Sequence, residues 1–410
     1  MGLIEREAYM KSDSRKPDAY RWVVMLAFMA VVAINQLLWI TFAPVTSEAV
    51  DFYGVSTLSI GLLSMSFMIV FILISIPASW AIDRFGIRTA VGLGATLTGV
   101  FGLLRGLAGN SYSLALFAQI MIAVGQPFIL NAITSVAAHW FPMEERATAS
   151  GLGSLSMYVG ILVGMLVTPL LTLRFGFSQM LIIYGIISLI PAGTFFIFVK
   201  ERPANVPPST EPEVRSLMFD GLKEIFKNKG FRILLAIFFV GLGAFNAVTT
   251  WIEDLLKPRG FSISQAGLAG GMMIIGGIIG ALILPTLSDR KQKRVPYLVA
   301  SILGATIGLA GVTYASGFFL LLASSFCLGF FLLSAGPIGF QFGAELTRPI
   351  PEGTSNGLML LMGQISGVIF IFGMELLKSP ADGSMTASLN ILLVMMAAAL
   401  LLSTRLKEPA

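Results

Sequence analysis

The stretch AIDRFGIRTAVG (residues 81–92) decides the fold, because it is a short charged interruption between two long apolar runs. A second interruption of the same kind, LSDRKQKRVPYL (residues 287–298), carries its Asp-Arg pair 206 residues further along the chain. Thr148 corresponds to Thr354 at the same offset. Several matches at one offset predict that the chain consists of two copies of one structural unit.

About twelve apolar runs, separated by short polar loops, occupy most of the 410 residues. The chain is 56% hydrophobic and only 12% charged, whereas soluble domains carry about 25% charged residues. A helix needs roughly 20 apolar residues to cross the hydrocarbon core of a bilayer. We therefore predict an all-α membrane protein of twelve spans embedded in a lipid bilayer. The spans are expected near 22–45, 56–82, 88–108, 113–138, 147–171, 178–199, 232–252, 264–286, 296–314, 317–342, 354–377 and 386–404.

The basic residues predict on which side of the membrane each loop lies. The tails and the even-numbered loops hold 22 of the 27 Lys and Arg residues. The odd-numbered loops hold only Arg105, Arg174, Lys257, Arg259 and Lys378. Because basic loops stay cytoplasmic, we expect both termini in the cytoplasm and a multi-pass protein of the cell (inner or plasma) membrane. The net charge of +5 follows from this bias, and we expect no binding of nucleic acid.

The repeat and the spans together predict how the chain is divided. The expected parts are a tail over 1–21, a six-helix bundle over 22–199, a linker over 200–231, a second six-helix bundle over 232–404 and a tail over 405–410. Apolar residues recur at helical spacing in the linker, so we expect an amphipathic helix on the cytoplasmic surface. Parallel repeats about an axis along the membrane normal are typical of major facilitator carriers, whose site lies between the halves.

The first charged loop resembles the G-x-x-x-D-R-x-G-R-R/K signature of the major facilitator superfamily, with Ser79 at the leading glycine. In that family the aspartate docks against the far half on the cytoplasmic face and latches the outward-open state. Spans five and eleven begin on this face, so their unpaired N–H groups would meet an incoming carboxylate. We predict a gating role for the matching residues of the two copies, Asp83, Arg84, Gly86, Arg88, Asp289 and Arg290.

No Asp, Glu or His lies at the predicted middle of a span. Proton-coupled carriers usually hold such a group there, because a buried acid must load and release a proton. Its absence favours facilitated diffusion, or coupling through groups nearer the span ends. The candidates for coupling are His139, Glu345 and Glu375, and surface placement is the simpler interpretation of His139.

Five amide side chains are predicted at similar depth, namely Asn35, Gln36, Gln126, Asn246 and Gln364. Uncharged polar groups in hydrocarbon must find partners, so these amides should face the bundle interior or a wet cavity. Each could simply join helices, but their common depth favours a substrate site.

Aromatic residues extend this site. The offset of 206 pairs Trp39 with Phe245 and Tyr158 with Gln364. Two aromatic faces across a pseudo-two-fold axis could stack on a cationic head group, although Trp39 could also belong to an interfacial belt. The other tryptophans, Trp22, Trp80, Trp140 and Trp251, lie at span ends, as belt residues do.

Beyond the superfamily signature, the chain resembles the feline leukaemia virus subgroup C receptor-related family, also called solute carrier family 49. Asn35 to Trp39, Phe52 to Ser56, Gln126 to Leu130 and above all the segment from Pro337 to Gln364 carry this resemblance. It implies transport of choline, ethanolamine, haem or pyridoxine-like substrates, often by uniport, and an aromatic choline box that includes Trp39 with Gln364 nearby. Asn246 replaces a tyrosine of that box, which favours a more polar substrate.

We therefore predict a monomeric facilitative carrier for a small polar or cationic organic solute, working by alternating access without cofactor or metal. Its expected substrate-binding residues are Trp39, Asn35, Gln36, Gln126, Tyr158, Phe245, Asn246 and Gln364. The alternative is a proton-coupled antiporter exporting hydrophobic or drug-like compounds. The glycine-rich fifth span loosely suggests it, with Thr168-Pro169 in place of the Gly-Pro pair of antiporters.

The sequence also bears on two other classes of protein. An intramembrane enzyme is not expected, because one His, one Cys and no deep carboxylate cannot build a nucleophile–base pair or a metal cluster. A sensor on a carrier scaffold stays open, and it would bind ligand without flux.

Overall fold

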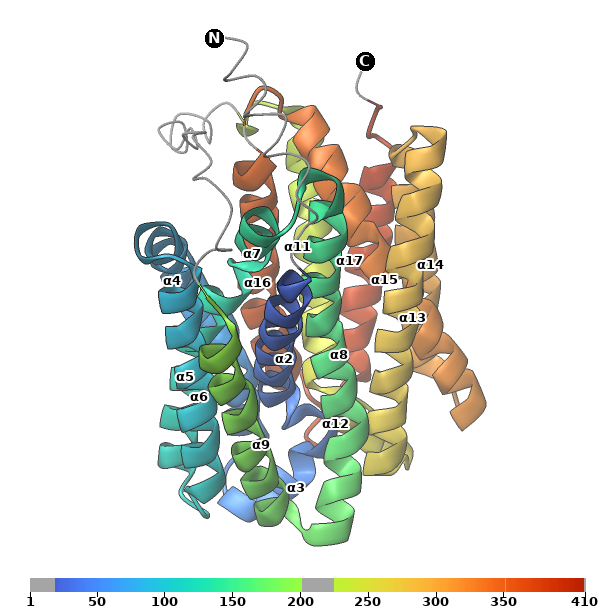
Figure 1. Cartoon of the computed structure of the whole chain (residues 1–410). Helices are drawn as coiled ribbons and strands as arrows, with labels where there is room; N and C mark the ends of the chain where they lie inside the picture. The colour runs from blue at the N-terminus through green and yellow to red at the C-terminus, as the bar shows by residue number, and fades with distance from the viewer. Residues whose placement is uncertain (1–18, 201–224, 351, 409–410) are drawn as a thin grey trace.

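The computed structural model of the chain describes residues 19–200, 225–350 and 352–408, and all regular secondary structure in these ranges is helical. Twelve helical segments are long and apolar enough to cross a membrane, and they run side by side along one direction (Figure 1). The first half contains α2 (Tyr20–Ile40), η1 (Ala43–Val45), α3 (Thr46–Tyr53), α4 (Thr57–Phe85), α5 (Ile87–Leu107), α6 (Tyr112–Leu130), α7 (Ile133–Trp140), α8 (Met143–Phe175) and α9 (Phe177–Phe198). The second half contains α11 (Lys229–Thr250), α12 (Ile252–Leu256), η2 (Lys257–Arg259), α13 (Ile263–Lys291), α14 (Val295–Tyr314), α15 (Phe318–Leu346), α16 (Glu352–Leu376) and α17 (Thr386–Ser403).

The predicted all-α class with twelve spans is confirmed, and the main difference concerns the first span. It was expected over 22–45, but α2 stops at Ile40, η1 follows, and α3 continues to Tyr53. Pro44 lies within the interruption. A proline has no N–H group and its ring clashes with the carbonyl four residues earlier, which favours a kink or a break, and here the chain continues as a short 3₁₀ turn.

The helices form two bundles that meet along two seams. In the first bundle α5 packs on α6 and α9, and α2 packs on α8; in the second, α13 and α14 pack on α15, and α11 packs on α16. The seams between the bundles are formed by α8 with α13 and by α4 with α16. Figure 1 shows α4, α5, α6 and α9 of the first bundle on the left and α13, α14 and α15 of the second on the right.

The repeat extends to the backbone of the charged loops. Gly86, between α4 and α5, adopts a positive φ of 82°. Gln292 occupies the corresponding position 206 residues later, with a φ of 52°, and it is the one non-glycine residue with positive φ in the described ranges. Glycine reaches this conformation without penalty. The second copy keeps the positive φ without the glycine, but its ψ is 37° where that of Gly86 is 169°, so the two turns differ.

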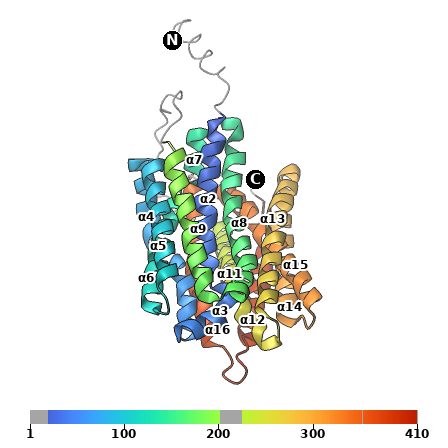
Figure 2. The same ribbon diagram turned by 60° about the horizontal axis from the view of Figure 1, so that its bottom comes forward.

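The two ends of the molecule differ in what they carry. α2 begins and α17 ends at one end, which we call the terminal face, whereas α3 and α12 lie at the other end, the opposite face (Figures 1 and 2). The charge bias predicts that the terminal face is cytoplasmic. The amphipathic helix predicted in the linker lies almost wholly outside the described residues.

Glycines of α8 let this helix approach α2 closely. A Cβ atom built on Gly160 would lie 2.0 Å from the carbonyl oxygen of Ala33, and one on Gly164 would lie 2.3 Å from Ile40 Cγ2. Small residues at four-residue spacing allow such contact between membrane helices. Gly151 on the same helix has no atom within 4 Å of the corresponding point.

We therefore expect Gly160→Ala to destabilise the protein by about 1–3 kcal/mol, because the clash is with backbone that cannot rotate away. Gly151→Ala is the matched control and should be neutral or slightly stabilising, since alanine favours helix over glycine by up to about 1 kcal/mol. Thermal unfolding of the two purified variants measures the difference. Equal midpoints would contradict the close packing of α8 on α2.

Candidate functional site

The opposite face is closed by hydrogen bonds between the two halves. The Glu253 carboxylate of α12 accepts from the backbone N–H of Ser47 at 2.7 Å and from the Ser47 hydroxyl at 2.6 Å. Lys257 Nζ donates to the same hydroxyl at 2.7 Å. Ser47 and Glu253 are separated by 206 residues, so equivalent positions of the two repeats meet on the pseudo-two-fold axis. We call the three residues Ser47, Glu253 and Lys257 the latch.

The latch carboxylate is buried, with only 1% of Glu253 exposed. Burial raises the pKa of Glu253 above its usual value, although the hydrogen bonds from Ser47 and the charge of Lys257 act in the other direction. A polar cavity of about 210 Å³ lies beside it, lined by Ser47, Asp254, Lys257 and Lys378 among others. Lys378 there forms an ion pair with Asp254 and lies 3.7 Å from Glu375.

Trp251 packs between the two bundles, close in sequence to the latch residue Glu253. Its side chain is fully buried, its indole N–H donates to the Ile371 carbonyl at 3.0 Å, and a Cβ atom built on Gly61 of α4 would lie 2.4 Å from the ring. The expectation that Trp251 belongs to an interfacial belt is therefore wrong, because a residue at the end of a span can face the partner bundle instead of lipid. Trp140, also expected in the belt, is buried as well.

Two of the predicted substrate amides lie within the first bundle. Asn35 is fully buried and donates to Thr98 Oγ1 at 3.0 Å, and Gln36 donates to the Asn35 amide oxygen at 3.2 Å. The Asn35 contact joins α2 to α5, whereas the Gln36 contact stays within α2. Asn246 is also nearly buried, and its Nδ2 donates to the Gly363 carbonyl of α16 at 3.2 Å.

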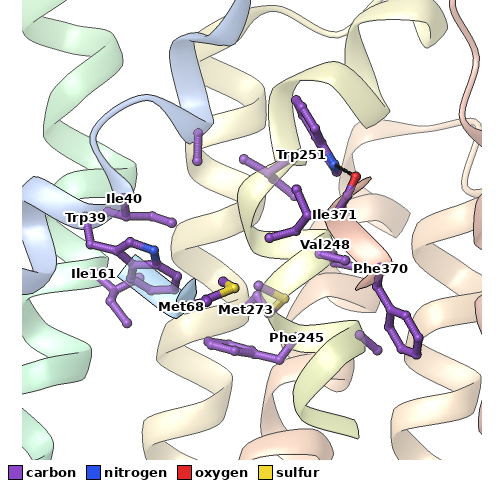
Figure 3. Close-up of a cluster of buried hydrophobic side chains, with 14 of the residues drawn as sticks. Trp39, Ile40, Met68, Ile161, Phe245, Val248, Trp251, Met273, Phe370 and Ile371 are labelled. Carbon is purple, nitrogen blue, oxygen red and sulfur yellow. Dashed lines mark hydrogen bonds between the residues drawn. The ribbon is translucent and has the colours of Figure 1, made fainter. Parts of the chain in front are cut away.

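Trp39 and Phe245 reach the same buried cluster from the two bundles, together with Met68 and Met273 (Figure 3). Only 5% of Trp39 and 7% of Phe245 are exposed. The indole N–H of Trp39 donates to the Ser64 carbonyl at 3.3 Å. The offset of 206 thus brings the two aromatics to a common centre, where apolar side chains surround them.

Three predicted polar residues lack partners. Gln126 of α6, Tyr158 of α8 and Gln364 of α16 make no side-chain hydrogen bond within the described ranges. Tyr158 and Gln364 are half-buried, and their polar atoms are absent from the fully enclosed groups without partners. Their side chains can therefore bind a solute or water, as polar groups within a bundle require.

The motif residues lie at the terminal face. Asp83, Arg84 and Arg88 are exposed, and Arg88 donates to the Phe196 carbonyl at 3.4 Å within its own bundle. Asp289 forms an ion pair with Arg294, also within its own bundle. The predicted docking of Asp289 against α8 is thus not made in this conformation. Arg290, like the other exposed basic residues here, lies on the surface.

The residues proposed for proton coupling all have local partners. His139 is exposed and its Nδ1 lies 2.7 Å from the Ser135 carbonyl. Glu345 accepts from Arg294 Nη2 at 3.1 Å and from Gln341 at 2.9 Å. Glu375 sits near Lys378 at the opposite face.

The charge map counted Arg105 with the odd-numbered loops although the expected span 88–108 contains it, and that count is wrong, because Arg105 lies in the last turn of α5 and is fully buried. Hydropathy cannot distinguish a residue in the last turn of a helix from one in the loop. The latch was also missed. The signal that could have found it is the offset of 206, because residues equivalent in the two repeats can meet on the axis.

Residues 24–371 match the Major Facilitator Superfamily. Solute carrier family 49 member A3 from Danio rerio is 27% identical over 376 residues, which cover 88% of this chain and 79% of that protein. The choline/ethanolamine transporter FLVCR2 from Homo sapiens is 29% identical over 379 residues, 87% of this chain and 71% of that protein.

A solved structure shares the fold. The bacterial homologue of the human lysosomal transporter Spinster, in an inward-facing and unoccupied conformation, superposes with a TM-score of 0.74 over 95% of this chain and 98% of that one, at 16% identity. Two helical bundles built from a repeat are typical of secondary transporters. The chain belongs to the Major Facilitator Superfamily, and its similarity to solute carrier family 49 extends over most of its length.

Removing the latch should open the opposite face. Glu253→Leu deletes the acceptor of two hydrogen bonds, and a hydrogen bond to a charged group contributes about 1.5–3 kcal/mol. We expect spin labels on Asn110→Cys and Ala381→Cys, in a Cys327→Ala background, to show a new population at longer distance by pulsed electron spin resonance. Both label positions are exposed and lie in loops of different halves.

Glu48→Leu is the matched control for this measurement, because Glu48 is an exposed acid on α3, next to Ser47. It should leave the distance distribution unchanged. If Glu253→Leu gave the distribution of the unaltered protein, Ser47 and Glu253 would not hold the face closed.

Proposed function

We propose that the chain moves a small polar or cationic organic solute, of the choline, ethanolamine or vitamin type, across the cell membrane by facilitative uniport. The observation that carries this proposal is the set of unpartnered polar groups on Gln126, Tyr158 and Gln364. They come from α6 and α8 of one half and α16 of the other. Polar side chains from both halves that have no partner within the described ranges are available to bind a small polar ligand.

Trp39, Phe245 and Asn246 would complete the site. The aromatic faces of Trp39 and Phe245 can attract a cationic or amine head group. Asn246 uses its Nδ2 for the Gly363 carbonyl, which leaves the amide oxygen as an acceptor for a hydroxyl or amine of the solute. The similarity to choline/ethanolamine transporters supports this solute class.

Transport would proceed by alternating access. The latch and Trp251 close the opposite face, whereas the ion pairs Arg21–Glu145 and Arg294–Glu345 at the terminal face each stay within one half. With the terminal face in the cytoplasm, this arrangement would correspond to an inward-facing state. In the outward-open state Asp83 and Asp289 would turn to the far half, as the motif resemblance implies.

Uniport is supported by the placement of the titratable groups. His139 is exposed, and Glu345 and Glu375 lie near the ends of their helices beside basic partners. A proton-coupled cycle needs an acid that is alternately loaded and emptied near the substrate. Trp39 and Phe245 lie instead in a buried cluster of apolar side chains.

We expect Trp39→Ala to reduce saturable uptake of labelled choline into proteoliposomes by about tenfold or more, which corresponds to about 1.4 kcal/mol of lost binding. Trp22→Ala is the matched control on the same helix, because Trp22 is 37% exposed, and it should retain uptake. Ethanolamine and pyridoxine are tested in parallel. Saturable uptake that survives Trp39→Ala unchanged would remove this residue from the site.

The uniport part of the proposal has its own test. Uptake should persist when an uncoupler dissipates the proton gradient, and Glu345→Gln should leave it within about twofold, because neither step involves a proton. Transport that collapses under both conditions would instead favour the proton-coupled antiporter of hydrophobic compounds.

A further inference from the structure

Arg105 is a fully buried cation in the first bundle. Its Nη1 donates to the Leu38 carbonyl at 2.8 Å and to Gln119 Oε1 at 2.7 Å, and its Nη2 donates to Thr41 Oγ1 at 3.3 Å. The guanidinium carbon lies 5.1 Å from the centre of the Phe42 ring. Within the described ranges Arg105 has no carboxylate partner. An uncompensated buried charge is costly, so a specific role must balance it.

The contacts of Arg105 converge on the interruption of the first span. α2 ends at Ile40, and Pro44 cannot donate a backbone hydrogen bond. The last carbonyls of a helix lack backbone partners and carry the negative end of its dipole. Arg105 supplies both a donor and a positive charge there, and Gln119 Nε2 adds a longer contact to the Leu38 carbonyl at 3.4 Å.

Two functional residues flank the interruption. Trp39 follows Leu38 directly and faces the central cluster. Ser47 lies in the first turn of α3, beyond the interruption, and forms the latch with Glu253. The angle at which α3 leaves α2 therefore decides whether Ser47 meets Glu253 while Trp39 meets the centre.

The second half lacks this arrangement. The offset of 206 maps Arg105 onto Gly311 and Gln119 onto Ser325. α12 begins in the same register as α3, since Ile252 corresponds to Thr46, but Ile40 corresponds to Asn246 and α11 continues to Thr250. The second half therefore breaks only briefly, at Trp251, and it has a glycine where the first half has Arg105. Arg105 is an addition to the half that carries Trp39.

We propose that Arg105 is a positioning residue that fixes the bend between α2 and α3 and thereby couples the placement of Trp39 to closure of the latch. The proposal deepens the proposed function and rests on it where transport is concerned. Loss of the guanidinium would free the Leu38 carbonyl and let α3 change its angle. Trp39 would then be less well placed, and the latch would close less completely.

The test uses Arg105→Met, Arg105→Lys and the control Arg174→Met in the full-length protein. Arg174 is an exposed arginine at the end of α8, at the same face. Spin labels on Glu48→Cys of α3 and Ala381→Cys, in the Cys327→Ala background, report the α3 angle. Acrylamide quenching of Trp39, obtained as the difference between each variant with and without Trp39→Phe, reports its burial. Neither measurement needs a substrate.

Arg105→Met should broaden the label distances and raise acrylamide quenching of Trp39 severalfold, with Arg174→Met like the unaltered protein. Arg105→Lys should restore both in part, because an ammonium can bind the Leu38 carbonyl but cannot reach all three acceptors together. For choline uptake, KM should rise by about tenfold with Vmax little changed, whereas general destabilisation would lower Vmax alone.

Unaltered label distances and Trp39 quenching in folded Arg105→Met would overturn the proposal. If this variant does not fold, Thr41→Val and Arg105→Lys take its place, and wild-type behaviour of both would overturn it equally. Absence of choline uptake by the unaltered protein would count against the proposed function only, since the label and quenching results stand without it.

Discussion

The requirement that every backbone and side-chain polar group find a partner away from water governs this molecule. In hydrocarbon each unsatisfied group costs several kcal/mol, so the chain crosses as helices, and every departure from a helix must be compensated by protein. The first span departs from it around Pro44, where Arg105 and Gln119 both donate to the carbonyl of Leu38 and Arg105 also donates to the Thr41 hydroxyl. The latch and the central cluster both depend on how this interruption is held.

The two halves share one fold, but the contact between them on the axis is asymmetric. The two halves share an offset of 206, a first helix that is followed by a short second one, and a positive φ at Gly86 and Gln292. On the axis, however, equivalent positions carry different chemistry, since Ser47 donates and Glu253 accepts. Two glutamates at these positions would repel each other. Divergence of the repeats instead places a donor against a carboxylate at the point where they meet.

Much of the fold follows from hydropathy along the sequence, because the length and polarity of each apolar run determine where it crosses the membrane. What lies beside each residue does not follow from hydropathy. Trp251 resembles a belt residue in sequence, yet it faces the other bundle. Arg105 resembles a loop residue, yet it is buried among carbonyl and amide groups. The sequence therefore predicts how deep each residue lies in the membrane. The direction in which its side chain points from the helix depends on packing, which hydropathy does not report.

The same limit applies to the amides of the candidate site. Asn35 and Gln126 have the same polarity and similar predicted depth, but Asn35 bonds Thr98 and Gln126 has no side-chain partner in the described ranges. Only the packing of α2 against α5 separates a structural amide from one that can meet a solute. The repeat offset was more informative, because residues equivalent in the two halves are related by the pseudo-two-fold axis. It paired Trp39 with Phe245, and both lie in one cluster.

The burial of that cluster bears on how a solute could enter. Trp39 and Phe245 are almost wholly covered while the opposite face is closed, and Met68 and Met273 lie in the same cluster. Methionine is unbranched and has three rotatable bonds, so it can yield to a ligand with little strain. A neutral site of aromatic, thioether and amide groups would hold a cation through ring faces and dipoles alone. Such a site contains no charged group that must be neutralised or protonated when the carrier changes conformation. Under this condition a carrier can move its solute in either direction, down the concentration gradient.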